Sequence, residues 1–293
     1  SEYVVIPVNL AVKIPSEVAL ESAAFTTLGS IAMQGIRRGN LTFGETIVIT
    51  GLGLLGLIAV QIAKAWGLIV IGNDINPTRL ELAKEMGADF CLDPRDNNFT
   101  DTIKKITNGH GADAVIIYAS TGSSEPANQA MQICRRKGRV VVVGAVGMDL
   151  HRDEMYAKEL DFLMSTSYGP GRYDPLYEQK GIDYPIGYVR WTENRNMIEF
   201  VRLLASGKVN VKRLISNSYT IDQVEAAYLS LLEDSSKNVA NIFVYSHDEK
   251  AIPAGRTIIQ PVSTLPGKIR VGIIGAGGFI QNNHLANILK LPE

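Results

Sequence analysis

The chain has 293 residues, of which 46% are hydrophobic and 20% charged, and its formal net charge is −1. This length suits one large or two ordinary domains with a buried core. A balance so close to neutral excludes the basic footprint of a nucleic-acid-binding protein, and two cysteines, Cys91 and Cys134, are too few for a disulfide framework.

The first residues, SEYVVIPVNL, carry an early Glu and no basic region, so we expect no secretory leader and a cytoplasmic protein. Apolar runs at Tyr3 to Pro7 and Leu10 to Ile14 predict strands whose sheet is completed elsewhere. Residues 16–38 then predict a helix-rich connector with Ser16 as its N-cap.

The most informative stretch is residues 46–74, which predicts a strand, a glycine turn, a helix, a second strand and a terminal acid. The glycines Gly51, Gly53 and Gly56 have the G-x-G-x-x-G spacing directly after an apolar β-branched run. In a dinucleotide site these glycines permit the tight turn, the approach of a pyrophosphate to the backbone, and close packing of helix on strand. The amides at the start of the helix, at Leu54 and Leu55, would face the phosphates.

Asp74 ends the second apolar strand, eighteen residues after Gly56. A carboxylate there accepts hydrogen bonds from an adenosine ribose and repels a 2′-phosphate, which favours NAD over NADP. Residues 47–63 carry no charge and could be read as a membrane span, but three glycines and the following strand-length segment argue against it. We expect no membrane partner and no nucleic-acid partner.

Strands and helices continue to alternate over about 120 residues, as in repeated βαβ units. This alternation predicts an α/β fold with a doubly wound parallel Rossmann sheet, whose ligand crevice lies at the carboxyl ends of the strands. The further elements expected are helices near 77–86, 100–107 and 126–137, and strands near 89–92, 113–119, 139–143 and 160–167.

Residues 165–197 depart from this alternation and are rich in Tyr, Trp, Pro and Gly. Two readings stay open for this aromatic lobe: the aromatic side chains line a substrate site, or they pack against a neighbouring domain or subunit. Packing is favoured, because Tyr, Trp and Arg are generally enriched at interfaces. Beyond the lobe we expect helices at 197–206 and 222–232, capped by Asp222 in the second case, and strands at 214–220 and 239–245.

The order of parts from AAFTTLGSIAMQGIRR through GETIVITGLGLLGLIAVQIAKAWG to IGNDINPTRLELAKEMGAD resembles the cofactor domain of medium-chain dehydrogenase/reductases, the alcohol dehydrogenase-like family. The resemblance covers roughly residues 1–250. It implies that Asp74 holds the adenosine ribose with Arg79 beside it; a solvent-facing role for Arg79 is the alternative. It further implies that Ser120 and Thr121, after the fourth strand, flank the adenosine side of the cofactor. The backbone of Val143, Gly144 and Ala145, after the fifth strand, would contact the nicotinamide.

The chain departs from that family in its metal ligands. Zinc-dependent members use Cys and His ligands, whereas two isolated cysteines and four scattered histidines cannot assemble such a site here, so we expect a non-zinc member with no metal. The resemblance implies no catalytic acid or base that can be named in this chain. Thr27 and Ser30 are candidates for lying near the nicotinamide, with tight helix packing as the alternative.

A second glycine motif, Gly275 to Phe279, follows a proline-spaced stretch and an apolar run. It resembles the opening of the glucose-fructose oxidoreductase and inositol dehydrogenase family, with Ile280 in the third glycine position. We therefore expect part of a longer bi-domain oxidoreductase. The expected segments are a catalytic-domain remnant with the connector helix at 1–38, the NAD-binding domain at 39–167, the lobe and the return to the catalytic domain at 168–250, a linker at 251–268 and the start of a second dinucleotide unit at 269–293.

The function expected from these features is NAD(H) binding within an oxidoreductase that moves a hydride between nicotinamide and an alcohol or carbonyl, with a sugar or polyol as the substrate class. The chain alone is expected to bind cofactor better than it turns anything over. The alternative is a non-catalytic NAD-binding or assembly module. The family resemblance implies a homo-oligomer that pairs edge to edge through the sixth strand of the sheet, at Asp161 to Ser167.

Overall fold

The computed structural model describes residues 4–233, 238–245, 280 and 285–289. The chain divides into two units, Ser1–Tyr245 and Ser246–Glu293. In the second unit the described part includes the short helix α11 (Ala286–Ile288). The expected linker and the motif at Gly275 lie outside the described residues. No helix in the described ranges is long and apolar enough to cross a membrane.

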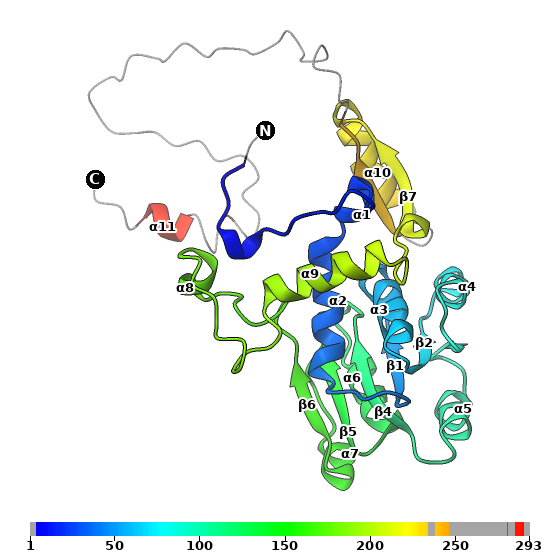
Figure 1. Cartoon of the computed structure of the whole chain (residues 1–293). Helices are drawn as coiled ribbons and strands as arrows, with labels where there is room; N and C mark the ends of the chain where they lie inside the picture. Colours follow the sequence, from blue (N-terminus) through cyan, green and yellow to red (C-terminus); the bar gives the residue numbers. More distant parts are fainter. Residues whose placement is uncertain (1–3, 234–237, 246–279, 281–284, 290–293) are drawn as a thin grey trace, which may run out of the picture. The chain divides into compact units, whose positions relative to one another are not determined.

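A six-stranded parallel sheet forms the centre of the first unit (Figure 1). Its order is β3-β2-β1-β4-β5-β6, so the direction of winding reverses between β1 and β4. The predicted α/β fold with a doubly wound parallel sheet is confirmed. The strands are β1 (Thr46–Thr50), β2 (Ile69–Asn73), β3 (Phe90–Leu92), β4 (Ala112–Ile117), β5 (Cys134–Val142) and β6 (Asp161–Met164).

Helices cover both faces of this sheet, which explains why its central strands contain the fully buried apolar runs Ile47 to Ile49 and Ala114 to Ile117. Ile47 and Ile49 of β1 face one buried cluster and Val48 faces the other. The first cluster includes residues of α2 (Thr26–Arg38), α3 (Leu54–Ala65), α4 (Pro77–Glu85) and α9 (Glu193–Ala205). The second includes residues of α5 (Phe99–Ile106) and α6 (Glu125–Ile133), and the partly buried Met155 of α7 (Arg152–Lys158) packs against it.

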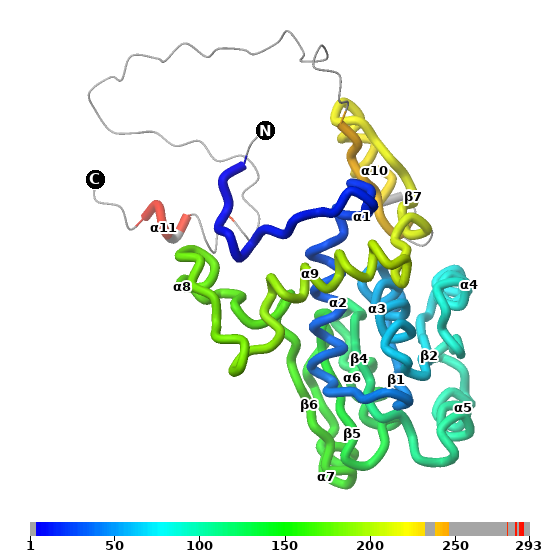
Figure 2. Tube along the Cα trace, in the orientation of Figure 1, coloured from blue at the N-terminus to red at the C-terminus, as the bar shows by residue number. Residues whose placement is uncertain are grey.

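Helix α9 packs on α2, although the two are far apart in the sequence (Figure 2). Gly29 makes this approach possible, because a Cβ there would lie 2.2 Å from the ring of the fully buried Phe200. The connector helix is thereby fixed over the sheet. It is preceded by α1 (Leu20–Ala23), and neither helix begins at Ser16, so the predicted N-cap is wrong.

Other predicted boundaries also differ. The strands expected before residue 15 are wrong: from residue 4 onward this segment contains the 3-10 turn η1 (Val8–Leu10) and no strand, since no neighbouring strand of the described structure pairs with it. The helix expected at 126–137 ends at Ile133. Its last residues instead extend β5, where Cys134 pairs with Ala112 and Arg135 is bound to Asp113.

After α9 the chain forms a separate parallel pair, β7 (Ile215–Tyr219) and β8 (Ala240–Phe243). The turns η2 (Lys212–Leu214) and η3 (Ile221–Gln223) and the helix α10 (Val224–Glu233) lie between α9 and β8 in the sequence. The predicted cap Asp222 is wrong, because the N-cap is Thr220, two positions earlier, which forms a capping box with Gln223.

The aromatic lobe, residues 165–197, contains the short helix α8 (Pro175–Glu178) and the start of α9. Tyr177 is fully buried and its ring stacks on that of Tyr184 at 5.3 Å. Tyr173 and Tyr188 remain largely exposed. Packing within the chain therefore accounts for some of the aromatic residues of the lobe and not for others.

Glu193 is a buried ionisable group in this lobe. It occupies the first turn of α9 after the Thr192 cap, and its side chain is fully buried. Burial, with a smaller contribution from Glu178, raises the pKa of Glu193 from 4.5 to about 7. The carboxyl is therefore protonated in the folded protein under mildly acidic conditions where the unfolded chain has lost that proton.

We expect this difference to make folding stability depend on pH. Between pH 4.5 and about 7 the folded state binds a proton on Glu193 that the unfolded state does not, so the free energy of unfolding should fall as the pH rises through this window. Glu193→Gln should flatten that fall, as measured by urea denaturation at several pH values. The matched control Glu85→Gln, at an exposed ion pair, should keep the wild-type slope; an unchanged slope in Glu193→Gln would contradict the assignment.

Candidate functional site

A cleft of 740 Å³ opens at the carboxyl ends of β1, β2 and β4, beside the point where the winding of the sheet reverses. In doubly wound folds this is where ligands bind. The glycine turn and Asp74 form part of its wall, and the loops after β3 and β4 form the rest. The lining residues are Thr50, Gly51, Gly53, Asn73, Asp74, Ile75, Pro94, Arg95, Tyr118, Ala119, Ser120, Thr121, Ser123, Glu125, Pro126 and Gln129.

Each glycine of the turn has a distinct geometric reason. Gly51 has a φ of +88°, and a Cβ there would lie 2.6 Å from the backbone nitrogen of Ala119. A Cβ on Gly56 would lie 2.0 Å from the carbonyl oxygen of Gly51, so only glycine lets α3 begin this close to the turn. A Cβ on Gly53 would meet nothing within 4 Å. The backbone at Gly53 is therefore bare and faces open space in the cleft wall.

The amino end of α3 follows immediately. Gly53 is its N-cap and has no side chain to bind the first amides, and the first helical hydrogen bond runs from Leu57 N–H to the Gly53 carbonyl. The amides of Leu54 and Leu55 precede that bond, and unpaired helix amides favour anions. Neither leucine side chain lines the cleft, and both are half-buried.

Asp74 is held against the glycine turn. One carboxylate oxygen accepts a hydrogen bond from Leu52 N–H at 2.7 Å, and the other accepts from Asn76 N–H at 2.8 Å. Asn76 in turn caps α4 by accepting from Thr78 N–H. The carboxylate thus lines the cleft in a fixed orientation, with remaining acceptor capacity for a ligand hydroxyl.

The segments that follow β4 and β5 pair with each other. Ser120 pairs with Ala145 in a parallel bridge, and Thr121 N–H donates to the Ala145 carbonyl at 2.8 Å. A Cβ on Gly144 would lie 2.0 Å from the Ala119 carbonyl oxygen, so glycine is required for this approach. Ser120 lines the cleft, whereas Val143, Gly144 and Ala145 lie next to it in the fold but outside its wall.

Arg79 does not line the cleft. Its side chain is buried rather than solvent-facing, so that alternative is wrong, and its guanidinium donates to the Asn238 carbonyl beside β8. Burial lowers the pKa of Arg79, and the charge of Asp74 partly opposes that shift. Arg79 is therefore electrostatically linked to Asp74 without lining the cleft.

Several cleft residues were not anticipated from the sequence. Asn73 is 1% exposed, and neither atom of its amide has a hydrogen-bond partner among the described residues. Arg95 pairs with Asp93 at 2.6 Å and donates to the Ile75 carbonyl at 2.8 Å. Asn73 is the last residue of β2, and Arg95 follows the end of β3, so both lie at the carboxyl edge of the sheet. Their position at strand ends is the signal in the sequence that could have identified them.

Thr27 and Ser30 of the connector helix, suggested to lie near the nicotinamide, have different environments. Ser30 is fully buried, and its hydroxyl donates to the Thr26 carbonyl one turn earlier at 2.8 Å. Thr27 is exposed. Neither lines the cleft. Helix packing accounts for Ser30.

The chemistry of the cleft fits a dinucleotide. It combines a bare glycine backbone and free helix amides for a pyrophosphate, a fixed carboxylate for a ribose diol, and a buried polar amide at Asn73. Zinc does not fit in the same way. Across the described residues no three His, Cys, Asp or Glu side chains are grouped to hold a metal ion, and structural or catalytic zinc needs three or four convergent ligands.

Comparison with known proteins gives a family match over part of the chain and a shared fold. Residues 55–179 match the family model described as zinc-binding dehydrogenase. A sorbitol dehydrogenase of Bacillus subtilis strain 168 is 30% identical over 230 residues, which are 77% of this chain and 58% of that protein. The chain thus spans less than three fifths of the length of this curated relative.

Two solved structures share the fold. An alcohol dehydrogenase from Escherichia coli CFT073, complexed with NADH, has a TM-score of 0.64 at 23% identity, covering 81% of this chain and 63% of its own. A zinc-binding dehydrogenase from Sinorhizobium meliloti 1021, bound to NADP, has a TM-score of 0.59 at 22% identity, covering 78% and 59%. The two structures show a shared fold, and the family match makes residues 55–179 similar to a zinc-binding dehydrogenase domain.

Proposed function

We propose that this chain is the NAD(H)-binding part of an oxidoreductase that transfers a hydride between nicotinamide and an alcohol or carbonyl, with polyols or sugars as the substrate class. The observation that carries the proposal is the cleft in which the bare backbone of Gly53 and the fixed carboxylate of Asp74 lie together. The likeness to a sorbitol dehydrogenase supports the substrate class.

In this proposal the protein orients the cofactor, and the bound nicotinamide supplies the hydride chemistry. The turn at Gly51 to Gly56 and the first amides of α3, at Leu54 and Leu55, bind the pyrophosphate. Asp74 binds the adenosine ribose, and its charge is the reason to propose NAD rather than NADP. Ser120 flanks the adenosine side of the cofactor, and the backbone at Val143 to Ala145 contacts the nicotinamide.

Zinc binding, assembly and cellular location complete the proposed function. The residues described here offer no ligand set for zinc, so we propose that this chain contributes no zinc site. We propose a cytoplasmic homo-oligomer that pairs through β6, whose Met164 is 54% exposed at the sheet edge, with no nucleic-acid or membrane partner. The Gly275 motif is proposed, from its sequence, to open a second dinucleotide unit like that of glucose-fructose oxidoreductases.

A first test places a side chain in the cleft without disturbing the fold. Gly53→Val adds bulk where nothing of the chain lies within 4 Å, so the melting temperature should stay close to wild type while NADH affinity falls about tenfold or more, through loss of pyrophosphate contacts. Titration followed by nicotinamide fluorescence measures this. Gly122→Val, also in open space but outside the cleft lining, is the control and should bind normally. Equal affinity in the two variants would refute the placement of the pyrophosphate.

A second test concerns the choice of cofactor. Asp74→Ser removes the charge facing the ribose, so NADH affinity should fall about tenfold, as expected for loss of hydrogen bonds to a charged group worth about 1.5–3 kcal/mol, while NADPH affinity should hold or rise. Asp93→Asn, which changes a carboxylate paired with Arg95, is the matched control and should keep the preference. If Asp74→Ser prefers NADH as strongly as wild type, Asp74 does not set cofactor choice.

Turnover separates the enzyme from a binding module. The chain is titrated with NADH and then supplied with NAD and a panel of polyols and sugars, with NADH formation followed by absorbance. Saturable NADH binding together with polyol-dependent reduction supports the dehydrogenase. Saturable binding without turnover agrees with the expectation that the chain alone binds cofactor better than it turns anything over, and absence of binding overturns both the dehydrogenase and the non-catalytic module.

A further inference from the structure

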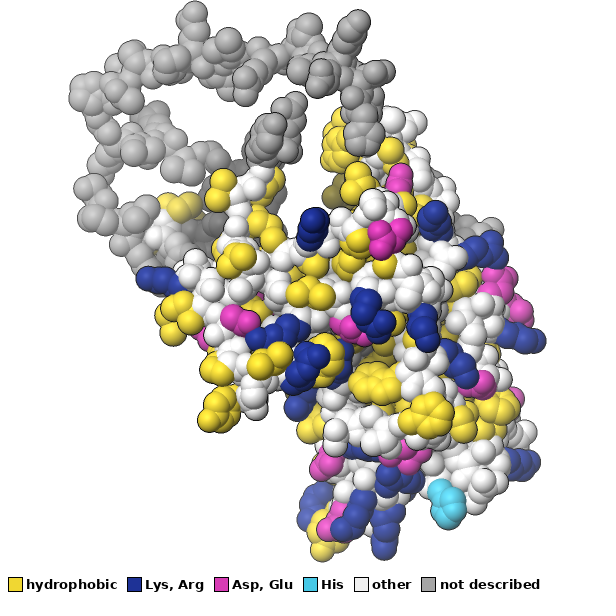
Figure 3. All heavy atoms as spheres, viewed as in Figure 1, with side chains coloured by type: hydrophobic (Ala, Val, Ile, Leu, Met, Phe, Trp, Pro, Cys, Tyr) yellow, Lys and Arg dark blue, Asp and Glu magenta, His cyan; other side chains and the backbone are white. Residues whose placement is uncertain are grey.

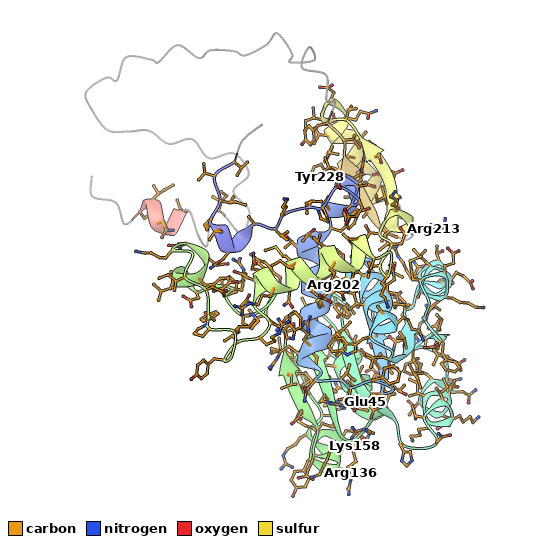
Figure 4. The ribbon with its side chains drawn as sticks, viewed as in Figure 1. Glu45, Arg136, Lys158, Arg202, Arg213 and Tyr228 are labelled. Atoms are coloured by element: carbon orange, nitrogen blue, oxygen red, sulfur yellow. The ribbon has the colours of Figure 1, made fainter. Side chains whose placement is uncertain are left out.

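A second cavity lies on the helical layer away from the dinucleotide cleft and shares no residue with it. Its volume is 290 Å³, and α2, α3, α9 and the end of the aromatic lobe enclose it. Figure 3 shows Lys and Arg side chains beside apolar ones on the face that carries α9, and Figure 4 marks Arg202 on that helix. The residues that matter for its chemistry are Arg37, Trp66, Trp191, Glu199 and Arg202.

Arg37 is the central group of this cavity. Its guanidinium lies 3.4 Å from the ring centroid of Trp191 and 5.6 Å from that of Trp66. It donates to the amide oxygen of Asn196 at 2.9 Å and to the sulfur of Met33 at 3.3 Å. Both acceptors are neutral. Within the described residues no carboxylate lies within ion-pair distance of Arg37, so its charge has no direct counter-ion.

A second cation lies close by. The guanidinium of Arg190 is 3.9 Å from the same Trp191 ring and also has no ion pair in the described part of the chain. Arg202, by contrast, is bound through two nitrogens to Glu199, at 2.7 and 2.9 Å. Burial lowers the pKa of Arg37 to about 10; the charge of Glu199 opposes this shift, and the charge of Arg190 adds to it. Arg37 thus remains charged at neutral pH, and the cavity has an excess of positive charge.

From this arrangement we propose that the cavity binds a small anionic sugar, carrying either a carboxylate or a phosphate. The anion would pair with Arg37, and guanidinium groups bind both kinds of oxyanion well. The indole of Trp66, only partly buried, offers an apolar face for the C–H groups of a sugar ring. A volume near 300 Å³, at the lower end for small-molecule sites, suits one ring rather than a dinucleotide. The site does not depend on the proposed cofactor cleft.

The chain contains only two tryptophans, and both line this cavity, so intrinsic fluorescence reports directly on its occupancy. We expect glucuronate and glucose 6-phosphate to give saturable fluorescence changes at constant ionic strength, and glucose to give none. A response to one of the two anionic sugars identifies the carboxylate or the phosphate as the preferred anion. No saturable response to either, an equal response to glucose, or the full response from inorganic phosphate alone would overturn the proposal.

Two charge variants move the affinity in opposite directions. Arg37→Gln should weaken binding of the anionic sugar at least tenfold, and Glu199→Gln, which removes the negative charge from the lining, should strengthen it severalfold. Arg213→Gln, at an exposed pair with Glu85, is the control and should bind as wild type. NADH affinity should be the same in all three.

Glu199→Gln keeps the proposal testable if Arg37→Gln does not fold. If circular dichroism shows that Arg37→Gln is unfolded, the result for Glu199→Gln decides, because Glu199 is joined to Arg202 at the surface and its loss leaves the core intact. Unchanged or weaker sugar binding by folded Glu199→Gln, or a matching change in its NADH affinity, would refute a local anion site.

Discussion

The hydrogen bond from Leu52 N–H to the Asp74 carboxylate is the constraint on which the candidate site depends. It joins the glycine turn after β1 to the end of β2, so the groups proposed for the pyrophosphate and for the ribose cannot move independently. Gly51 N–H donates to the Asn73 carbonyl beside it at 2.9 Å. A residue other than glycine at Gly51 or Gly56 would force the turn away from β4 or from α3, and the carboxylate would lose its fixed position.

Local sequence predicted the sheet well because the central strands contain fully buried apolar runs, Ile47 to Ile49 and Ala114 to Ile117, and because caps such as Asn76 with Pro77 mark helix starts by short-range chemistry. The failures arise where distant partners decide. One failure is the segment from Cys134 to Lys137, which directly follows a helix in the sequence and was predicted to continue it. In the structure it belongs to β5, because Cys134 pairs with Ala112 and Arg135 is bound to Asp113. Residues before 15 are apolar enough for strands but have no described strand to pair with.

The residues of the candidate site also divide into those that local sequence could predict and those that it could not. Gly51, Gly53 and Asp74 belong to one continuous stretch, and their spacing alone predicts that they meet. Asn73 and Arg95 line the cleft because strands β2 and β3 end at the same edge, which requires the strand order to be known. Arg79 follows Asp74 by five residues in the sequence, but burial against the segment that contains Asn238 turns its guanidinium away. Local spacing cannot reveal a partner 159 residues away.

The aromatic lobe shows what long-range packing adds to such a domain. Asn196 donates to the Tyr168 carbonyl at 2.9 Å and accepts from Arg37, so one amide ties the lobe, α9 and α2 together. This places Trp191 over Arg37, while Gly29 lets α9 approach α2. The guanidinium is therefore held between neutral acceptors and aromatic rings, without a described carboxylate in contact. A buried cation is costly without a counter-charge, so a cavity opening beside Arg37 gives an anion both space and an electrostatic reason to bind.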